Sequence, residues 1–101
     1  MALILTPGKD AVTATLEGDL TIFAAEELQD ELLGLLNHQK AVLSLKEVTE
    51  VDGCGIQLLL ILKAEADRTG KSLTLLSGNA AVDDAWRLLG LPPLPSGEEE
   101  A

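Results

Sequence analysis

Apolar and polar residues alternate near the amino terminus of the chain. The apolar residues Val12, Ala14 and Leu16 alternate with two threonines and a glutamate, which is the two-residue period of a strand with one buried face. A shorter apolar run, Leu3–Leu5, precedes this strand, and a proline and a glycine between the two favour a turn. The pattern predicts a hairpin of two strands, 3–5 and 11–17, in which Gly18-Asp19 ends the second strand.

Three later stretches carry apolar residues every three or four positions, the spacing of helices that bury one side. The first spans Ile22–Leu36, with Thr21 as its expected N-cap. The second covers about 53–69 and the third runs from 79 or 80 to 89, and each is followed by a glycine that favours a helix stop. The positions expected to be buried are Leu28, Leu32 and Leu35 or Leu36 in the first helix, Ile56, Leu59, Leu60 and Ala64 in the second, and Val82, Trp86 and Leu89 in the third.

Two short apolar runs, Ala41–Leu45 and Ser72–Leu76, alternate with these helices. The first is expected to be a central strand covered on both faces, because it is almost free of polar residues, and residues 46–51 are expected to form a loop. Strands separated by single helices pair in parallel through right-handed crossovers, with helices covering the sheet. The order β-β-α-β-α-β-α therefore predicts an α/β fold whose sheet is mixed, since the N-terminal hairpin adds an antiparallel pair.

Length and composition fit one globular domain. The chain has 101 residues, of which 47% are hydrophobic, enough for one core and too many for an intrinsically disordered protein. With one Trp, one Phe and no Tyr, the core must consist mainly of aliphatic side chains. We expect a single domain over residues 1–91 and a flexible acidic tail over residues 92–101.

The charge of the chain restricts its partners. The formal net charge is −10 at pH 7, and a body of that sign repels phosphate backbones and anionic lipid. Nucleic acid and membrane surfaces are therefore not expected partners, whereas basic surfaces of a protein are compatible. The apolar run 58–62 is interrupted by Lys63 and falls short of the roughly 20 residues that cross a bilayer. A single cysteine, Cys54, and no visible signal peptide favour the cytoplasm.

The residues Asp52-Gly53-Cys54-Gly55, directly before an apolar helix, are the strongest candidate for a functional site. Asp52 can cap the helix by accepting hydrogen bonds from free N–H groups of the first turn. The two glycines permit a sharp turn and the close approach of another surface. Free N–H groups at a helix start also favour an anion, but a cap alone explains Asp52, so the cap is the preferred interpretation.

Cys54 has no recognisable catalytic partner in the sequence. A thiol nucleophile needs a base and an oxyanion pocket, and the single histidine, His38, belongs to another predicted element. His38 also has no second His or Cys at the spacing of metal ligands. We therefore expect no enzyme activity, no metal and no cofactor, and we keep a redox-sensing thiol as a separate hypothesis.

The element order and two sequence stretches resemble the STAS domain, the fold of bacterial anti-sigma factor antagonists and of sulfate-transporter regulatory tails. The first stretch is Leu16–Thr21, followed by the helix over 24–36. The second is Leu43–Ile56, which leads into the next helix and then Gly70–Leu73. In the family this second stretch is an apolar strand and a short loop, followed by Asp-Ser-Ser-Gly-Leu or Asp-Thr-Ala-Gly-Leu at the helix start. The resemblance covers residues 3–91.

The resemblance carries over to single residues only in part. Asp52, Gly55 and Ile56 match the family's aspartate, glycine and aliphatic residue. In the anti-sigma factor antagonists a partner kinase phosphorylates the serine directly before that glycine. Here Cys54 holds this position, and Gly53 replaces the other small hydroxyl residue. A serine kinase is not expected to accept a thiol, so the phosphorylation switch of the family is not expected at Cys54.

The resemblance implies a regulatory protein that binds a protein partner: a kinase-like anti-sigma factor, a histidine kinase or a response regulator. Gly18–Ile22 and Asp52–Leu59 are most similar to the STAS proteins of bacterial chemotaxis and two-component systems. An alternative is a small STAS subunit of an ATP-binding-cassette transport complex, and a homo-oligomer is compatible with both. The expected contact residues are Asp19, Thr21, Thr49, Asp52, Gly53, Cys54, Gly55, Gln57 and Ile61.

Overall fold

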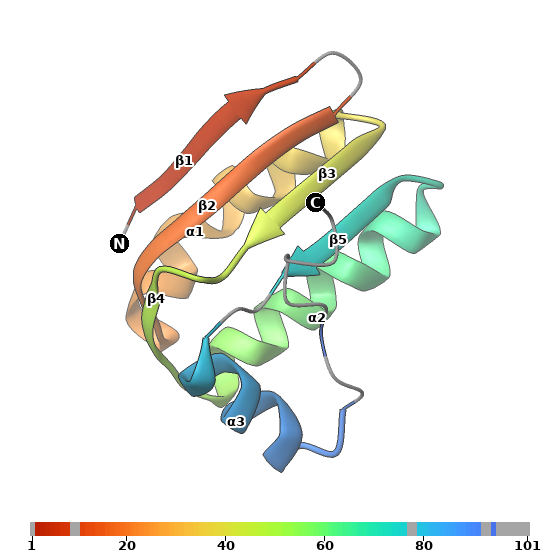
Figure 1. Cartoon of the computed structure of the whole chain (residues 1–101). Coiled ribbons are helices and arrows are strands. Elements are labelled where there is room, and N and C mark those ends of the chain that lie inside the picture. Colours follow the sequence, from red (N-terminus) through yellow and green to blue (C-terminus); the bar gives the residue numbers. More distant parts are fainter. Residues whose placement is uncertain (1, 9–10, 77–78, 92–93, 95–101) are drawn as a thin grey trace.

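The computed structural model describes residues 2–8, 11–76, 79–91 and 94 of the chain. Within these residues it consists of strands on one side and helices on the other (Figure 1). In chain order the elements are β1 (Ala2–Pro7), β2 (Ala11–Leu20), α1 (Ile22–Leu33), the 3-10 helix η1 (Gly34–Asn37), β3 (Lys40–Ser44), β4 (Val48–Val51), α2 (Gly53–Arg68), β5 (Ser72–Leu76) and α3 (Ala80–Leu88).

One mixed sheet organises the chain. Its strand order is β1-β2-β3-β5, and β4 pairs with the carboxyl end of β2 (Figure 1). β1 and β2 are antiparallel, with Leu3 opposite Leu16, whereas the pairs β2–β3, β2–β4 and β3–β5 are parallel. The predicted α/β fold, with an N-terminal hairpin and parallel crossovers, is confirmed.

The helices cover one face of the sheet. Figure 1 shows α1 and α2 side by side behind the strands, and α3 at the end where β4 lies. In β3 the side chains of Ala41 and Leu43 are buried, whereas Val42 and Ser44 stay partly exposed on the other face. The prediction that this strand is covered on both faces is wrong, because a short aliphatic strand does not reveal whether a second layer of helices exists.

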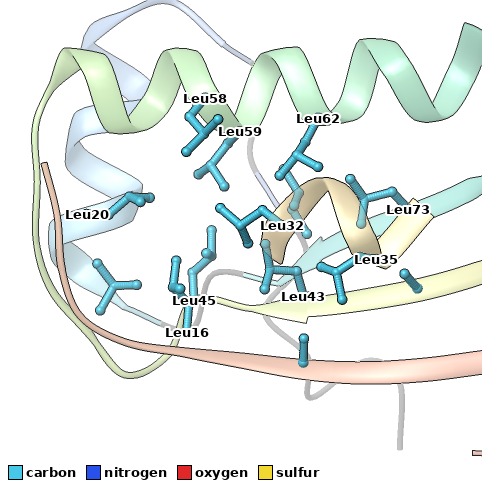
Figure 2. Close-up of a cluster of buried hydrophobic side chains, with 14 of the residues drawn as sticks. Leu16, Leu20, Leu32, Leu35, Leu43, Leu45, Leu58, Leu59, Leu62 and Leu73 are labelled. Carbon is cyan, nitrogen blue, oxygen red and sulfur yellow. The ribbon is translucent and has the colours of Figure 1, made fainter. Parts of the chain in front are cut away.

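Leucine dominates the core between the sheet and the helices (Figure 2). Leu16 and Leu43 of the sheet lie in one cluster with Leu32 of α1 and Leu59 of α2, and all four are fully buried. Full burial of one such side chain contributes about 1.5–3 kcal/mol, so this cluster is the main stabilising element of the fold. Trp86 belongs to the same cluster, as predicted.

The buried side of α2 differs in part from the prediction. Ile56 and Leu59 are buried as expected, but Leu60 is 37% exposed and Ala64 is exposed. The helix carries apolar residues around most of its circumference, so its sequence does not show which of them face the sheet. The residues that complete the buried side are Leu58, Leu62 and Ala66.

Two predictions about the strands are wrong. β2 continues through Gly18-Asp19 to Leu20, and the predicted loop 46–51 contains β4. Gly18 has a φ of 97°, which glycine adopts at little cost, and the register of the β2–β4 pair shifts between Gly18 and Asp19. This irregularity lets β2 pair with β3 along its first part and with β4 at its end. The pairing joins segments far apart in the sequence, and a local pattern does not report it.

The first helix and the chain after the third helix also differ from the prediction. α1 ends at Leu33 and continues as η1, and Thr21 occupies the N-cap position without a side-chain cap hydrogen bond. Leu28, Leu32 and Leu35 are buried as predicted. Leu94, which was expected in a flexible tail, is partly buried against the core. The remaining residues of that predicted tail, 92–93 and 95–101, lie outside the described part of the chain.

Candidate functional site

β4 and α2 meet at a corner that comprises residues 51–55, here called the β4–α2 corner. The main-chain N–H of Asp52 donates to the carbonyl of Leu20 at the end of β2, over 3.2 Å. The Asp52 carboxylate accepts from the main-chain N–H of Gly55 at 2.9 Å, which satisfies one of the free donors of the first helical turn. Asp52 is therefore the N-cap of α2, as predicted.

The two glycines of the corner have different environments. A Cβ at Gly55 would lie 2.2 Å from the carbonyl oxygen of Leu20, so the first turn of α2 packs directly on the main chain of β2. At Gly53 nothing lies within 4 Å of such a Cβ, and the residue is exposed. Neither glycine has a positive φ. The expectation of a glycine-specific sharp turn is wrong, and the close approach occurs only at Gly55, toward the chain's own strand.

A hydrogen bond joins two of the predicted contact residues across β2 and β4. The hydroxyl Oγ1 of Thr49 donates to Oδ1 of Asp19 at 2.9 Å. Asp19 is also the register partner of Glu50, and both carboxylates are exposed. Two like charges opposite each other on neighbouring strands repel, and they give this end of the sheet an acidic surface.

Cys54, Gln57 and Ile61 form an exposed stripe along α2. Residues three, four and seven positions apart share one side of a helix, and all three side chains are exposed, Ile61 to 52%. Asp52 is partly exposed at the start of this stripe, whereas Gly55 is buried. Thus the corner lies at the molecular surface, and the buried Gly55 lets the first turn of α2 pack against the main chain of β2.

Thr21 lies close to the same corner. It directly follows Leu20, whose carbonyl accepts the hydrogen bond from Asp52, and it is partly exposed. β4 therefore brings the predicted contact residues of the β2 end, Asp19 and Thr21, next to those of the β4–α2 corner. The structure thus gathers into one region residues that the sequence places in three separate segments.

The topology separates the Cys54 thiol from the single histidine. Cys54 is a free, exposed cysteine in the first turn of α2, which follows β4 at the carboxyl end of β2. His38 precedes β3, whose start pairs with the start of β2 at the opposite end of the sheet. In the described part of the chain no group of three or more His, Cys, Asp or Glu residues could hold a metal ion. None of the helices among these residues has the length and apolar character to span a membrane.

Asn79 holds β4 in place, a role that the sequence did not indicate. Its Oδ1 accepts from the N–H groups of Ala81 and Val82, at 2.8 and 3.3 Å, and so caps α3. Its Nδ2 donates to the carbonyl of Lys46 at 3.1 Å and to that of Val48. One amide side chain thus pairs with two main-chain donors at the start of α3 and with two main-chain acceptors, one just before β4 and one in its first residue. An Asn before an apolar helix indicates the cap, but no local signal reveals the contact with β4.

Comparison with known proteins agrees with this architecture. A family model described as "Mlab, STAS domain" matches residues 6–94. The anti-sigma factor antagonist SpoIIAA in its unphosphorylated form superposes with a TM-score of 0.72 at 19% identity, over 89% of this chain and 82% of that one. An anti-sigma factor antagonist from Mycobacterium paratuberculosis gives 0.82 at 12% identity, over 97% and 88%. A sulfate transporter family protein from Wolinella succinogenes gives 0.62 at 16% identity, over 95% and 75%.

A search of the curated proteins gives no match to this sequence. These three solved structures are less than 25% identical in sequence to this chain, and they show that the fold is shared. The family model, by contrast, matches the sequence itself, from the end of β1 through α3 to Leu94. Sequence match and fold agree, and this chain belongs to the STAS domain family.

Proposed function

We propose that this protein is a non-enzymatic regulatory module that acts by binding a protein partner. The contact surface is the exposed side of the β4–α2 corner, together with the end of β2 and the exposed stripe of α2. Gly55 is buried and supports this surface without being part of it. The proposed contact residues are Asp19, Thr21, Thr49, Asp52, Gly53, Cys54, Gln57 and Ile61.

The exposure of Cys54 is the observation that carries the proposal. By the family resemblance, Cys54 stands where a partner kinase phosphorylates a serine, and here this position is exposed at the start of a stripe that includes Gln57 and Ile61. A thiol has about the size of the serine hydroxyl, but it is not a substrate for a serine kinase. We therefore expect docking at this position without phosphorylation of Cys54.

The class of partner is inferred from the relatives. Two structures with the same fold are described as anti-sigma factor antagonists, which supports a kinase-like anti-sigma factor as the partner. The sequence resemblance to chemotaxis and two-component STAS proteins supports a histidine kinase or a response regulator. We place the protein in the cytoplasm, because an exposed free thiol such as Cys54 persists in a reducing compartment.

The test is affinity capture of the partner with the tagged full chain from native lysate, followed by mass spectrometry. Cys54→Asp and Ile61→Glu each place a charge on the stripe and should abolish capture of a partner that the wild type retains. The matched control is Ile4→Glu, because Ile4 is 49% exposed on β1, away from the stripe. Capture that survives both stripe variants, or phosphate found on Cys54, would contradict the proposal. Thermal unfolding of each variant separates loss of binding from loss of folding.

A second candidate function is that of a subunit in a transport complex. One structure with this fold is described as a sulfate transporter family protein. In this case the same surface would bind an ATP-binding-cassette subunit. The identity of the captured protein distinguishes the candidates, since a nucleotide-binding transport subunit supports the second and a signalling kinase or response regulator supports the first.

A further inference from the structure

The last residue of α3 and the residue after it are exposed leucines. Leu88 is 84% exposed and Leu89 is 56% exposed, and no other large apolar side chain among the described residues reaches these values. The prediction that Leu89 is buried is wrong, because α3 ends at Leu88 and Gly90, at a φ of +73°, turns the chain away. Exposed apolar side chains that gather beside a groove mark interaction surfaces.

The two leucines border a groove of about 190 Å³ beside the β4–α2 corner. Asp52 and Gly53 of the corner and Ile56 of α2 line its other side. Sites for drug-sized ligands occupy roughly 300–1,000 Å³, so the groove suits a single side chain of a protein better than a free small molecule. Its lining is mostly aliphatic, which favours an aliphatic side chain.

Two exposed carboxylates lie on the strands next to the groove. Glu50 directly precedes Val51, which lines the groove, and Asp19 is the register partner of Glu50 on β2. Both residues are exposed, and residues 46–55 carry three acidic residues against one lysine. Where the structure describes the chain, ion pairs lie within α2 and within α3, and neither involves Glu50 or Asp19. Their charge is therefore available to a cationic partner, and complementary charge raises both the association rate and the selectivity of binding.

We propose that the groove receives an aliphatic side chain from a basic segment of the protein partner, whose Lys or Arg residues face the carboxylates of Glu50 on β4 and Asp19 on β2. The inference rests on the proposed function and names the chemistry of the partner. Protein interfaces concentrate their binding free energy in a few buried anchors in well-packed pockets, and charges at the rim contribute mainly to the rate and the selectivity of binding. Nucleic acid or an anionic membrane would meet the same carboxylates and be repelled.

The experiment titrates the isotope-labelled full chain with three synthetic peptides and follows its amide resonances. The first peptide is an amphipathic sequence of leucine and lysine, the second replaces its leucines by serine, and the third replaces its lysines by glutamate. The first should shift the amides of Gly53, Leu88 and Leu89 in a saturable way, and the other two should bind at least roughly tenfold more weakly. The double variant Leu88→Ser, Leu89→Ser should weaken the first peptide by about the same factor, whereas Ile4→Ser on β1 should not.

Three results would overturn the inference: equal binding of the serine peptide, equal binding of the glutamate peptide, or shifts confined to β1 around Ile4. The failure of the proposed function looks different. If a captured partner is lost with Cys54→Asp but retained by the double leucine variant, the inference fails and the function stands. If the leucine–lysine peptide binds as expected but the Cys54→Asp and Ile61→Glu variants still capture the partner, the proposed function fails instead.

Discussion

The carbonyl oxygen of Leu20 lies so close to Gly55 that a Cβ at position 55 would meet it at 2.2 Å. The same oxygen accepts the hydrogen bond from the N–H of Asp52. One main-chain group at the end of β2 thus fixes both the last residue before α2 and the first turn of α2. The surface that we propose for partner binding is built on this contact.

Replacement of Gly55 by alanine should destabilise the protein by about 3 kcal/mol, at the upper end of the usual cost of overpacking. The reason is that the added methyl group meets main chain, which cannot rotate away as a side chain could. The control is Gly53→Ala, where the added methyl has open space and should be neutral or stabilise by up to about 1 kcal/mol. Urea unfolding measures both, and equal free energies of unfolding would refute the role of the Leu20 contact.

Loss of the Asp52 cap should be smaller and should depend on the acceptor oxygen. Asp52→Ala removes the acceptor for the Gly55 N–H and should cost about 0.5–2 kcal/mol. Asp52→Asn keeps a side-chain acceptor and should cost only a few tenths of a kcal/mol. The same unfolding measurement applies. An Asn variant as unstable as the Ala variant would show that the charge, and not the cap hydrogen bond, matters.

Asn79 offers a test of the link between α3 and β4. Asn79→Ala removes the cap and both donors, and should cost about 2 kcal/mol. Asn79→Asp keeps the cap acceptor but places an oxygen, in place of the amide nitrogen, against the carbonyls of Lys46 and Val48. It should therefore speed hydrogen exchange of the β4 amides although aspartate is as good an N-cap as asparagine. Exchange of β4 at the wild-type rate in the Asp variant would rule out the linking role.

The exposed thiol permits a test of the contact surface without changing the sequence. N-ethylmaleimide should modify Cys54 in the folded protein, because the side chain is exposed. The bulky adduct should then block capture of the partner, by at least roughly tenfold if it occupies the centre of the interface. Cys54→Ser supplies the control, since it should bind the partner with or without the reagent. A modified wild-type protein that still captures the partner would exclude Cys54 from the interface.

Much of the fold could be predicted because its signals are local. The strand alternation of Val12–Leu16, the helical spacing of Leu28 and Leu32, and the Asp52 cap all involve residues within one turn or one strand. Each of these predictions is confirmed. The three helices and the N-terminal hairpin followed from the same kind of pattern.

The candidate site could be predicted only in outline. Cys54 is exposed at the helix start, in agreement with a corner at the molecular surface. The sequence predicts a loop where β4 lies, and it contains no signal for the Thr49–Asp19 and Asn79–Val48 contacts. The sequence predicts that Leu89 is a core residue, but it borders the groove. These features depend on segments that are distant along the chain and meet only when β4 pairs with β2.

Propensity, periodicity and capping act between residues a few positions apart, and they account for the helices, the hairpin, the leucine core and the cap at Asp52. Other features arise only in the folded chain: β2 extends to pair with β4, helices cover one face of the sheet, and Leu88 and Leu89 lie beside the β4–α2 corner. These outcomes follow from backbone pairing and packing between distant segments, where the same residue type can be buried or exposed according to what lies opposite.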